Sequence, residues 1–212
     1  MEAGREIFVE SPTGRWVIAA TTARMFGSYC VAFYKPLYFA KVYPNFVDEF
    51  SIGNAFIYVG IATFSALIGG YLSDKYEDKS YRFKSYLCMI SGFFACPAIV
   101  ACAVYQNDFW FSLEMSALHY IFAELLIAPS ITMIQNTTSV KNQGFSAGVY
   151  TVFQTIGGLI GTTALGYVQK TMITPLNGDD VSLYGTTFAA FVAFGYLLSV
   201  PLYWKAGIEY EK

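Results

Sequence analysis

Six long apolar runs cover most of this 212-residue chain, and they constrain its fold more than any other feature. Each run is long enough, at about 1.5 Å per residue, to cross the roughly 30 Å hydrocarbon core of a bilayer as a helix. Only 13% of the residues are charged and 55% are hydrophobic, which excludes both an ordinary water-soluble domain and a disordered chain. The sequence therefore predicts an all-α membrane protein with six transmembrane helices: Trp16–Tyr34, Ile52–Ser73, Ser85–Tyr105, Phe109–Ile134, Phe145–Val168 and Leu183–Trp204.

Lysine and arginine predict how these spans are oriented, because cytoplasmic loops are enriched in both residues. Most of the 13 basic residues fall on the side that also holds both termini, whereas Lys35, Lys41 and Lys170 fall on the other side. We therefore expect an integral, multi-pass protein with both termini in the cytosol, in a membrane that the sequence does not specify. The expected parts are a cytosolic segment over residues 1–15, a six-helix bundle over 16–204 and a cytosolic tail over 205–212.

Charge and motif content exclude several classes of protein. The net charge of −2 provides no positive field to attract nucleic acid. The sequence has no H-E-x-x-H or P-loop motif and no intramembrane aspartate pair, so neither an enzyme nor a metal or cofactor site is expected. The four cysteines lie in apolar runs without zinc-type spacing, and we expect them to pack as small hydrophobic residues: Cys30, Cys88, Cys96 and Cys102.

The charged loop after the second apolar run contains the most diagnostic pattern. Gly70 is followed by Asp74 and Lys75 in the spacing G-x-x-x-D-K, and a basic cluster comes next that includes Arg82 and Lys84. This pattern resembles the loop signature of the major facilitator superfamily, which lies between the second and third helices of each six-helix half. In that role the glycine lets two helices approach, the aspartate caps a neighbouring helix N-terminus, and the basic residues pair across the cytoplasmic face.

The resemblance covers essentially the whole chain and implies one half of a twelve-helix transporter. Glu77 replaces the second glycine of the signature, a departure more often seen in the second half of such proteins, and the order of segments also matches helices seven to twelve. Such transporters work by alternating access, with the substrate near the midplane between two six-helix halves. We therefore expect the chain to be a fragment, to pair with a missing N-terminal six-helix half, or to form a parallel homodimer.

Within the superfamily, residues 122–126 (Phe-Ala-Glu-Leu-Leu) and 143–147 (Gln-Gly-Phe-Ser-Ala) are similar to the spinster-like lipid transporters. Those proteins carry a Gly-Glu-Leu-Leu stretch before a polar loop and a helix that opens with Gly-x-Ala, and Ala123 stands here in place of the glycine. The resemblance implies a lipid bilayer setting and a small organic anion or lysolipid-like substrate. A second hypothesis, motivated by the absent half and the degenerate loop signature, is a non-transporting structural subunit of a membrane complex.

The fourth apolar run carries two carboxylates on one helical stripe. Five residues of this run are spaced alternately by three and four positions, which places them on one face of an α-helix: Glu114, Ala117, Ile121, Glu124 and Ala128. An ionised carboxylate that faces lipid is costly, so we expect this stripe to face a protein interior or a watery cavity. Glu124 is the deeper residue and the first candidate for proton coupling or for contact with a substrate cation, while Glu114 lies near the outer end and can equally snorkel.

Arg24 is the other charge expected within the bilayer, on a face of small and polar residues. A buried guanidinium requires an anion, and three anions can supply it: Glu124, a substrate carboxylate or phosphate, or a carboxylate of a missing partner half. A headgroup phosphate suits the planar, bidentate donors of a guanidinium. His119 points away from the glutamate stripe, and we expect it to be packed and hydrogen-bonded rather than part of a proton relay.

The fifth apolar run is rich in small residues and predicts close helix packing. Glycine and threonine repeat along it at spacings of four and three residues, and a small-xxx-small pair lies beside them. Such a ridge supports tight static packing and is also compatible with rocking between two states. Gln154, midway along the run, is a further candidate for a substrate contact. The predicted packing residues are Gly144, Gly148, Gly157, Gly158 and Gly161.

Overall fold

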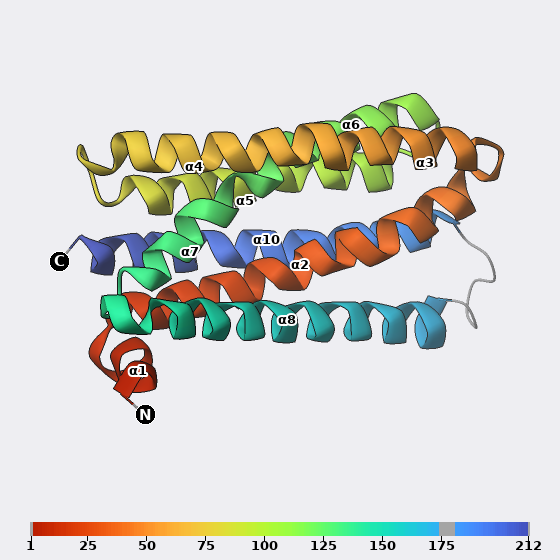
Figure 1. Cartoon of the computed structure of the whole chain (residues 1–212). Helices are drawn as coiled ribbons and strands as arrows, with labels where there is room; N and C mark the ends of the chain where they lie inside the picture. Colours follow the sequence, from red (N-terminus) through yellow and green to blue (C-terminus); the bar gives the residue numbers. More distant parts are fainter. Residues whose placement is uncertain (1, 174–180, 212) are drawn as a thin grey trace.

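The computed structural model describes residues 2–173 and 181–211, and these residues form long helices that run side by side (Figure 1). The described residues contain no β-strand. Both termini lie at the same end of the bundle, together with the connections between α4 (Thr63–Glu77) and α5 (Phe83–Val104) and between α7 (Ile127–Gln135) and α8 (Gln143–Val168) (Figure 1). We call this end the terminal end and the opposite one the far end.

The described residues form six rods, some of which consist of consecutive helical pieces. The first rod is α2 (Pro12–Val42), the third is α5, the fifth is α8 continued by the π-helical η6 (Gln169–Ile173), and the sixth is α10 (Val181–Tyr210). The second rod follows the short turn η2 (Pro44–Phe46) and consists of α3 (Val47–Phe56), the π-helical η3 (Ile57–Ala62) and α4. The fourth rod consists of α6 (Phe109–Ala123), the 3-10 turn η4 (Glu124–Leu126) and α7. The remaining short pieces are α1 (Glu2–Arg5), η1 (Glu6–Glu10) and η5 (Val140–Asn142).

Each of the six rods corresponds to one of the six predicted spans, although their ends differ, so the prediction of an all-α six-helix bundle is confirmed. Among the described residues, four rods are long and apolar enough to cross a membrane by themselves, namely residues 44–77, 83–104, 109–135 and 182–210. The other two rods, α2 and α8, lie within the same bundle, where α2 packs against both α10 and α8. Their apolar character is diluted, because α2 contains Arg24 and Lys35 and α8 is rich in glycine and threonine.

The first rod begins earlier than the apolar run predicts. Ser11 caps it, since the Ser11 side chain accepts a hydrogen bond from the Gly14 amide at 3.1 Å. Pro12 occupies the first turn, where the missing amide hydrogen of proline does no harm.

The same rod also ends later than predicted. The helix continues past Tyr34 and through Pro36 to Val42. Lys35, which the charge count placed beyond the far end of the span, instead lies inside the helix and is fully buried. The prediction was wrong because a lysine and a proline side by side usually indicate a helix boundary, whereas here neighbouring rods accommodate both residues.

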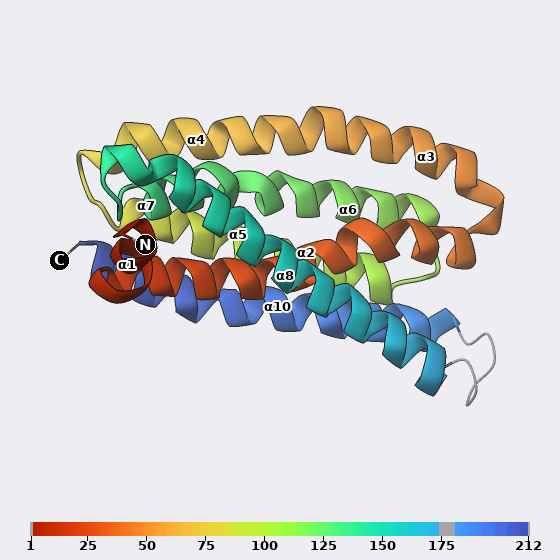
Figure 2. The same cartoon turned by 60° about the horizontal axis from the view of Figure 1, so that its bottom comes forward.

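Two glycines let α8 cross closely over α2 (Figure 2). A Cβ atom on Gly157 or Gly161 would collide with the backbone carbonyl of Thr22 or Phe26, respectively. Only glycine therefore permits this approach, which is the contact expected of a small-xxx-small pair in a membrane bundle.

Of the other predicted packing glycines of α8, one contacts a neighbouring helix of the described structure and two do not. Gly158 lies against the ring of Tyr29, in the same crossing. Gly144 and Gly148 have no atom within 4 Å of their Cβ positions in the described structure, so they do not pack as predicted. Because α8 crosses α2 diagonally, the close contact is confined to one stretch of the helix (Figure 2).

At the terminal end the chain folds back onto the α7–α8 connection. The Glu6 carboxylate accepts hydrogen bonds from the Ser139 amide and from the Asn142 side chain, each at 3.1 Å. These donors stabilise the charged form, so they hold the pKa of Glu6 below its ordinary value of 4.5. Ile7 is fully buried against Gly14, and the N-terminal segment is thus part of the folded structure.

Candidate functional site

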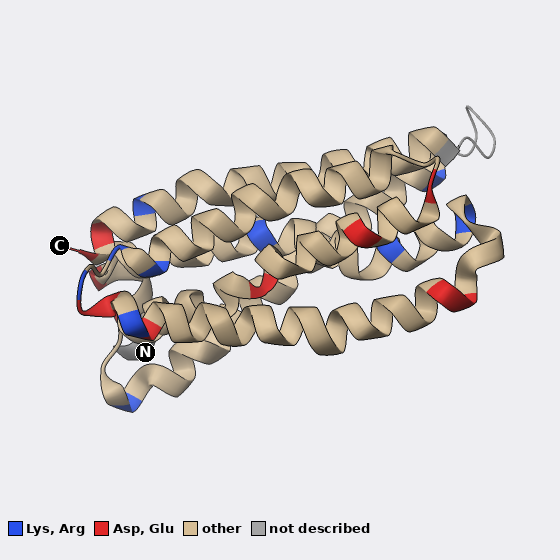
Figure 3. Ribbon diagram, turned by 90° about the horizontal axis from the view of Figure 1, so that it is seen from above, with Lys and Arg blue, Asp and Glu red and all other residues tan. Residues whose placement is uncertain are grey.

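Most charged residues lie at the two ends of the bundle, and a few lie along its middle (Figure 3). Arg24 and Lys35 of α2 and Glu124 of the fourth rod belong to the second group. Glu124 lines a hollow between α2 and the fourth rod, and Arg24 and Lys35 lie against tyrosines of its wall. Since charges far from water are costly, they mark the first place to look for a functional site.

The fourth rod is interrupted at Glu124, where the helix tightens into η4. Pro129 contributes to this break, because it has no amide hydrogen to donate to the carbonyl of Leu125 four residues earlier. Within the turn, the Ile127 amide donates to the Glu124 carbonyl. The Ala123 carbonyl is therefore left available to donors on neighbouring rods.

Arg24 is fully buried and uses this free carbonyl. Its guanidinium donates to the Ala123 carbonyl at 3.2 Å and to the Ser28 hydroxyl at 3.0 Å, and lies 3.3 Å from the centre of the Tyr196 ring. The Nε atom has no hydrogen-bond partner in the described part of the chain. Among the described residues, no carboxylate forms an ion pair with Arg24, so the Glu124 pairing considered above is not made here. Among the described residues, Arg24 is therefore a buried cation that no carboxylate contacts directly, although Glu124 is close enough to interact with it electrostatically.

A cavity of about 210 Å³ lies beside this cation, between α2, η3 and the fourth rod. Glu124 is half-buried in its wall. We call it the Glu124 cavity, and its polar and aromatic lining comprises Ser28, Tyr29, Tyr58, His119, Tyr120, Glu124 and Tyr196. The cavity thus combines a carboxylate, several hydroxyl groups and aromatic surface.

Lys35 is a second buried cation that the sequence interpretation missed. Its ammonium donates to the Ser116 hydroxyl at 3.1 Å and lies 4.5 Å from the centre of the Tyr120 ring. The Tyr58 ring is 5.2 Å away, and its hydroxyl accepts a hydrogen bond from that of Tyr120 at 2.6 Å. Because both tyrosines line the Glu124 cavity, Lys35 lies directly behind its wall. The apolar residues that follow Pro36 were the available signal that the helix continues.

His119 is packed and hydrogen-bonded at both ring nitrogens, as predicted. Nδ1 lies 3.1 Å from the Ala95 carbonyl, which can only accept, so Nδ1 carries the proton. Nε2 then accepts from the Tyr196 hydroxyl at 3.3 Å. The histidine therefore supports the tyrosine on which Arg24 stacks.

The other two predicted substrate contacts lie outside the Glu124 cavity. Glu114 is exposed on α6, toward the far end, and Gln154 is half-buried on α8. Neither residue belongs to the cavity wall. Glu124 is the predicted contact that lines the cavity, and Arg24 lies behind the wall, where it contacts the lining residues Ser28, Ala123 and Tyr196.

The predicted loop signature is divided between packed and exposed residues. Gly69, rather than Gly70, makes the closest helix contact, because a Cβ atom there would collide with the Leu125 backbone. Asp74 and Lys75 are exposed. The residues preceding α5 and α8 make no side-chain cap bond, and Asp74 caps neither helix in the described structure, contrary to the expectation from the signature.

The basic residues of the loop do form ion pairs. Lys84 is fully buried, and its ammonium lies 2.6 Å from the Glu77 carboxylate. Arg82 pairs with Glu211 near the C-terminus. Glu77, which stands where the signature has a glycine, therefore supplies the counter-ion of a buried lysine.

Comparisons with known proteins agree with this architecture. Residues 3–162 match the sequence model of the Major Facilitator Superfamily. The fold also matches the crystal structure of a bacterial homologue of the human lysosomal transporter Spinster, in an inward-facing and unoccupied conformation. That match has a TM-score of 0.77 and 16% sequence identity, and it covers 99% of this chain and 50% of the other. The chain thus spans about half the length of that structure. No curated protein sequence gives a significant match.

Proposed function

The chain belongs to the major facilitator superfamily, and from this premise we propose that it is the C-terminal six-helix half of a secondary transporter. The proposed activity is the movement of a small organic or lipid-like anion across a membrane by alternating access. Family membership points to transport rather than catalysis. The proposed orientation has both termini in the cytosol, which follows from the distribution of lysine and arginine.

The observation that carries the proposal is the unpaired Arg24 beside the Glu124 cavity. A buried guanidinium without a counter-ion is unfavourable unless an anion arrives to pair with it. The unsatisfied Nε atom offers a donor in addition to those already bound to Ser28 and Ala123. A substrate carboxylate or phosphate is the proposed anion, since a guanidinium binds both with parallel hydrogen bonds.

The aromatic part of the cavity supports a substrate that also has an apolar portion. Tyr58 and Tyr120 contribute aromatic rings to the lining, and Met25 and Ile127 add aliphatic surface. An amphipathic anion would place its charge toward Arg24 and its apolar part against these side chains. This supports a lipid-like or aromatic organic anion over a small inorganic one.

Glu124 is the proposed coupling residue. It lies in the cavity wall, so its proton would change the net charge that a substrate anion meets. Protonation would favour binding of the anion, and loss of the proton would favour its release. The two events would then be linked by one cavity, as a proton-coupled carrier requires.

A complementary six-helix unit is part of the proposal, because the Glu124 cavity is only one side of a substrate site. Large apolar side chains of the second rod are exposed: Phe56 is 75% exposed and Phe64 is 67% exposed. A separate N-terminal half or a second copy in parallel orientation would cover such surface and complete the site.

Uptake into proteoliposomes tests the proposed function. The chain would be purified in mild detergent with any partner half that accompanies it, and the test solute would be fluorescently labelled lysophosphatidylglycerol. Accumulation driven by a proton gradient is expected, with strong loss in Arg24→Ala and Glu124→Gln and no loss in Lys141→Gln, which alters an exposed cation elsewhere. Uptake that is equal in all four proteins would remove both assigned roles. A stoichiometric complex with unrelated proteins and no uptake would favour the structural-subunit hypothesis instead.

A further inference from the structure

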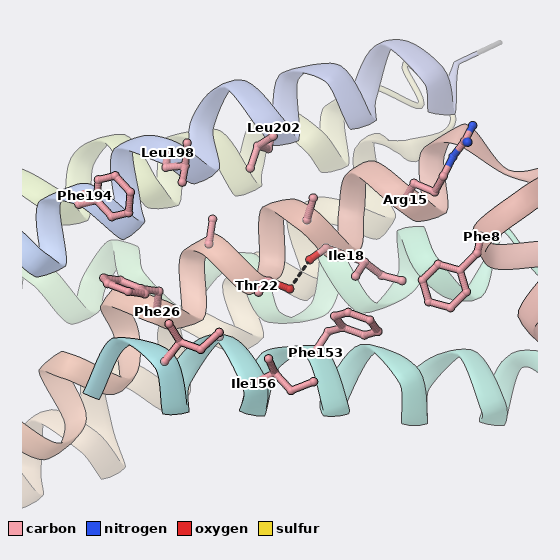
Figure 4. Close-up of a pocket in the computed structure, with 14 residues that line it drawn as sticks. Phe8, Arg15, Ile18, Thr22, Phe26, Phe153, Ile156, Phe194, Leu198 and Leu202 are labelled. Carbon is pink, nitrogen blue, oxygen red and sulfur yellow. Dashed lines mark hydrogen bonds between the residues drawn. The ribbon is translucent and has the colours of Figure 1, made fainter. Parts of the chain in front are cut away.

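A second hollow lies on the outside of the bundle, between α2, α8 and α10 (Figure 4). It is an open groove of about 470 Å³ and shares no lining residue with the Glu124 cavity. Its wall consists of aromatic and aliphatic side chains, with two polar residues, Arg15 and Thr22. The Thr22 hydroxyl already donates to the Ile18 carbonyl at 2.8 Å, so along its length the groove offers apolar contact.

Aromatic residues lie at both ends of the groove. Phe26 and Phe194 lie at one end (Figure 4), and Phe26 packs against Phe191 and Phe194 with ring centres 5.9 and 5.6 Å apart. At the terminal end, Phe8 packs on Phe153 with ring centres 5.9 Å apart, and the exposed Arg15 stands at the rim. The polar feature of the groove is therefore at the terminal end.

The length of the groove matches one leaflet of a bilayer. Arg15 and Phe26 are eleven residues apart on α2, which corresponds to about 16 Å at 1.5 Å per residue. Half of the hydrocarbon core of a bilayer is about 15 Å thick. Trp16, next to Arg15, is 37% exposed, and exposed tryptophans favour the headgroup region. The groove thus runs from headgroup depth to about the midplane.

We propose that this groove binds one acyl chain of an anionic phospholipid from the leaflet at the terminal end, with the lipid phosphate at Arg15. Charge complementarity supports an anionic headgroup, because Arg15 forms no ion pair among the described residues. A membrane-spanning helix of a partner would need a surface across both leaflets, whereas the α2 residues that line this groove extend only from Arg15 to Phe26. The bound lipid would fill the space between α8 and α10 on the outer side of α2.

Native mass spectrometry tests the proposal in the chain purified in mild detergent. Phosphatidylglycerol and phosphatidylcholine with identical acyl chains would be added in equal amounts. Preferential retention of one phosphatidylglycerol is expected. Arg15→Gln should weaken this retention about fivefold, which corresponds to about 1 kcal/mol for one basic residue near an anionic headgroup. Ala19→Trp should reduce retention of both lipids, because Ala19 lines the groove.

Matched controls separate the groove from general effects. Lys141→Gln removes an exposed cation outside the groove, and Ala190→Trp enlarges an exposed alanine of α10 outside it, so both should bind lipid as the unmodified chain does. Equal retention in Arg15→Gln, Ala19→Trp and the two controls would overturn the proposal.

A cross-linking measurement keeps the proposal testable if a variant fails to fold. A photoreactive leucine analogue at position 19 would be activated in intact membranes, and the adduct would be identified by mass. A phospholipid adduct is the expected result. An adduct with a second copy of the chain, or with another protein, would show that protein covers the groove and would overturn the proposal.

Discussion

Buried cations at the terminal end and in the middle of the bundle differ in their partners. At the terminal end, the buried Lys84 has the Glu77 carboxylate 2.6 Å away. In the middle, Arg24 and Lys35 are equally buried, yet each is held by hydroxyl, carbonyl or aromatic groups and not by a described carboxylate. Lys84 thus has a counter-ion in direct contact, whereas Arg24 and Lys35 have none among the described residues, and Arg24 is the cation that the proposed function assigns to an external anion.

The largest effect is expected when Arg24 is replaced by an uncharged side chain of similar length. In Arg24→Met we expect uptake of the labelled lysolipid to fall about 100-fold, or roughly 2.7 kcal/mol, because the proposed anion contact is lost. The thermal midpoint in detergent should stay the same or rise, since removing an unpaired buried charge relieves a desolvation cost. Normal uptake, or a large loss of stability, would contradict the assignment of Arg24 to substrate.

The terminal end should show the opposite behaviour. Glu77→Gln leaves Lys84 buried without its counter-ion, and we expect a loss of about 1–3 kcal/mol in the free energy of unfolding. Asp74→Asn, in the same loop, is the matched control, because Asp74 is exposed and caps no described helix. Denaturant or thermal unfolding in detergent measures both variants. Equal stability of the two would show that the Lys84–Glu77 pair does not hold the end together.

Lys35 is the second buried cation in the middle of the bundle, and a smaller effect is expected from it than from Arg24. It lies behind the tyrosines of the Glu124 cavity and does not line it, so its field should assist the anion without a direct contact. We expect Lys35→Met to raise the KM for the test anion about fivefold, or about 1 kcal/mol, with little change in the maximal rate. Concentration-dependent uptake measures both parameters. A reduced maximal rate at unchanged KM would argue instead that Lys35 takes part in a conformational step.

The smallest effect is expected at Glu6. Since its pKa is lowered by the hydrogen bonds from Ser139 and Asn142, its contribution to stability is present above the ordinary pKa of 4.5 and is lost as the pH falls below it. Amide hydrogen exchange at Ser139 should therefore be slow at pH 7, and faster in Glu6→Gln at the same pH. Exchange that is identical in both proteins would show that Glu6 does not hold the α7–α8 connection.

The sequence predicted the helices of the fold but not the contacts between them. The six rods and the superfamily were recognisable because hydropathy and the loop pattern are local properties. The contact between Arg24 and Ala123 joins residues 99 positions apart, and nothing in the local pattern around either residue indicates it. The internal position of Lys35 was missed for a similar reason, because Ser116 and the tyrosines that hold it come from other rods.

The candidate site was predictable in its charges and not in its geometry. Arg24 and Glu124 were selected because ionisable residues are rare in apolar runs. The glutamate stripe assumed a continuous helix, whereas the fourth rod tightens at Glu124 and leaves Glu114 exposed, away from the cavity. Pro129 was the available signal for an irregular turn, but a proline alone does not say where the released carbonyl will find its donors.

The shared carbonyl of Ala123 has a mechanical consequence. It accepts from Arg24 on α2 and from Ser91 on α5, so three rods are fastened at the point where the fourth one bends. Beyond that point α7 is a short lever arm of nine residues that leads to the α7–α8 connection. A change of about 10° in its tilt would displace the tip by about 2 Å, given 1.5 Å per residue. An anion that draws Arg24 away from the Ala123 carbonyl would remove one of these hydrogen bonds. The tilt of α7 could then change, and the α7–α8 connection would move with it.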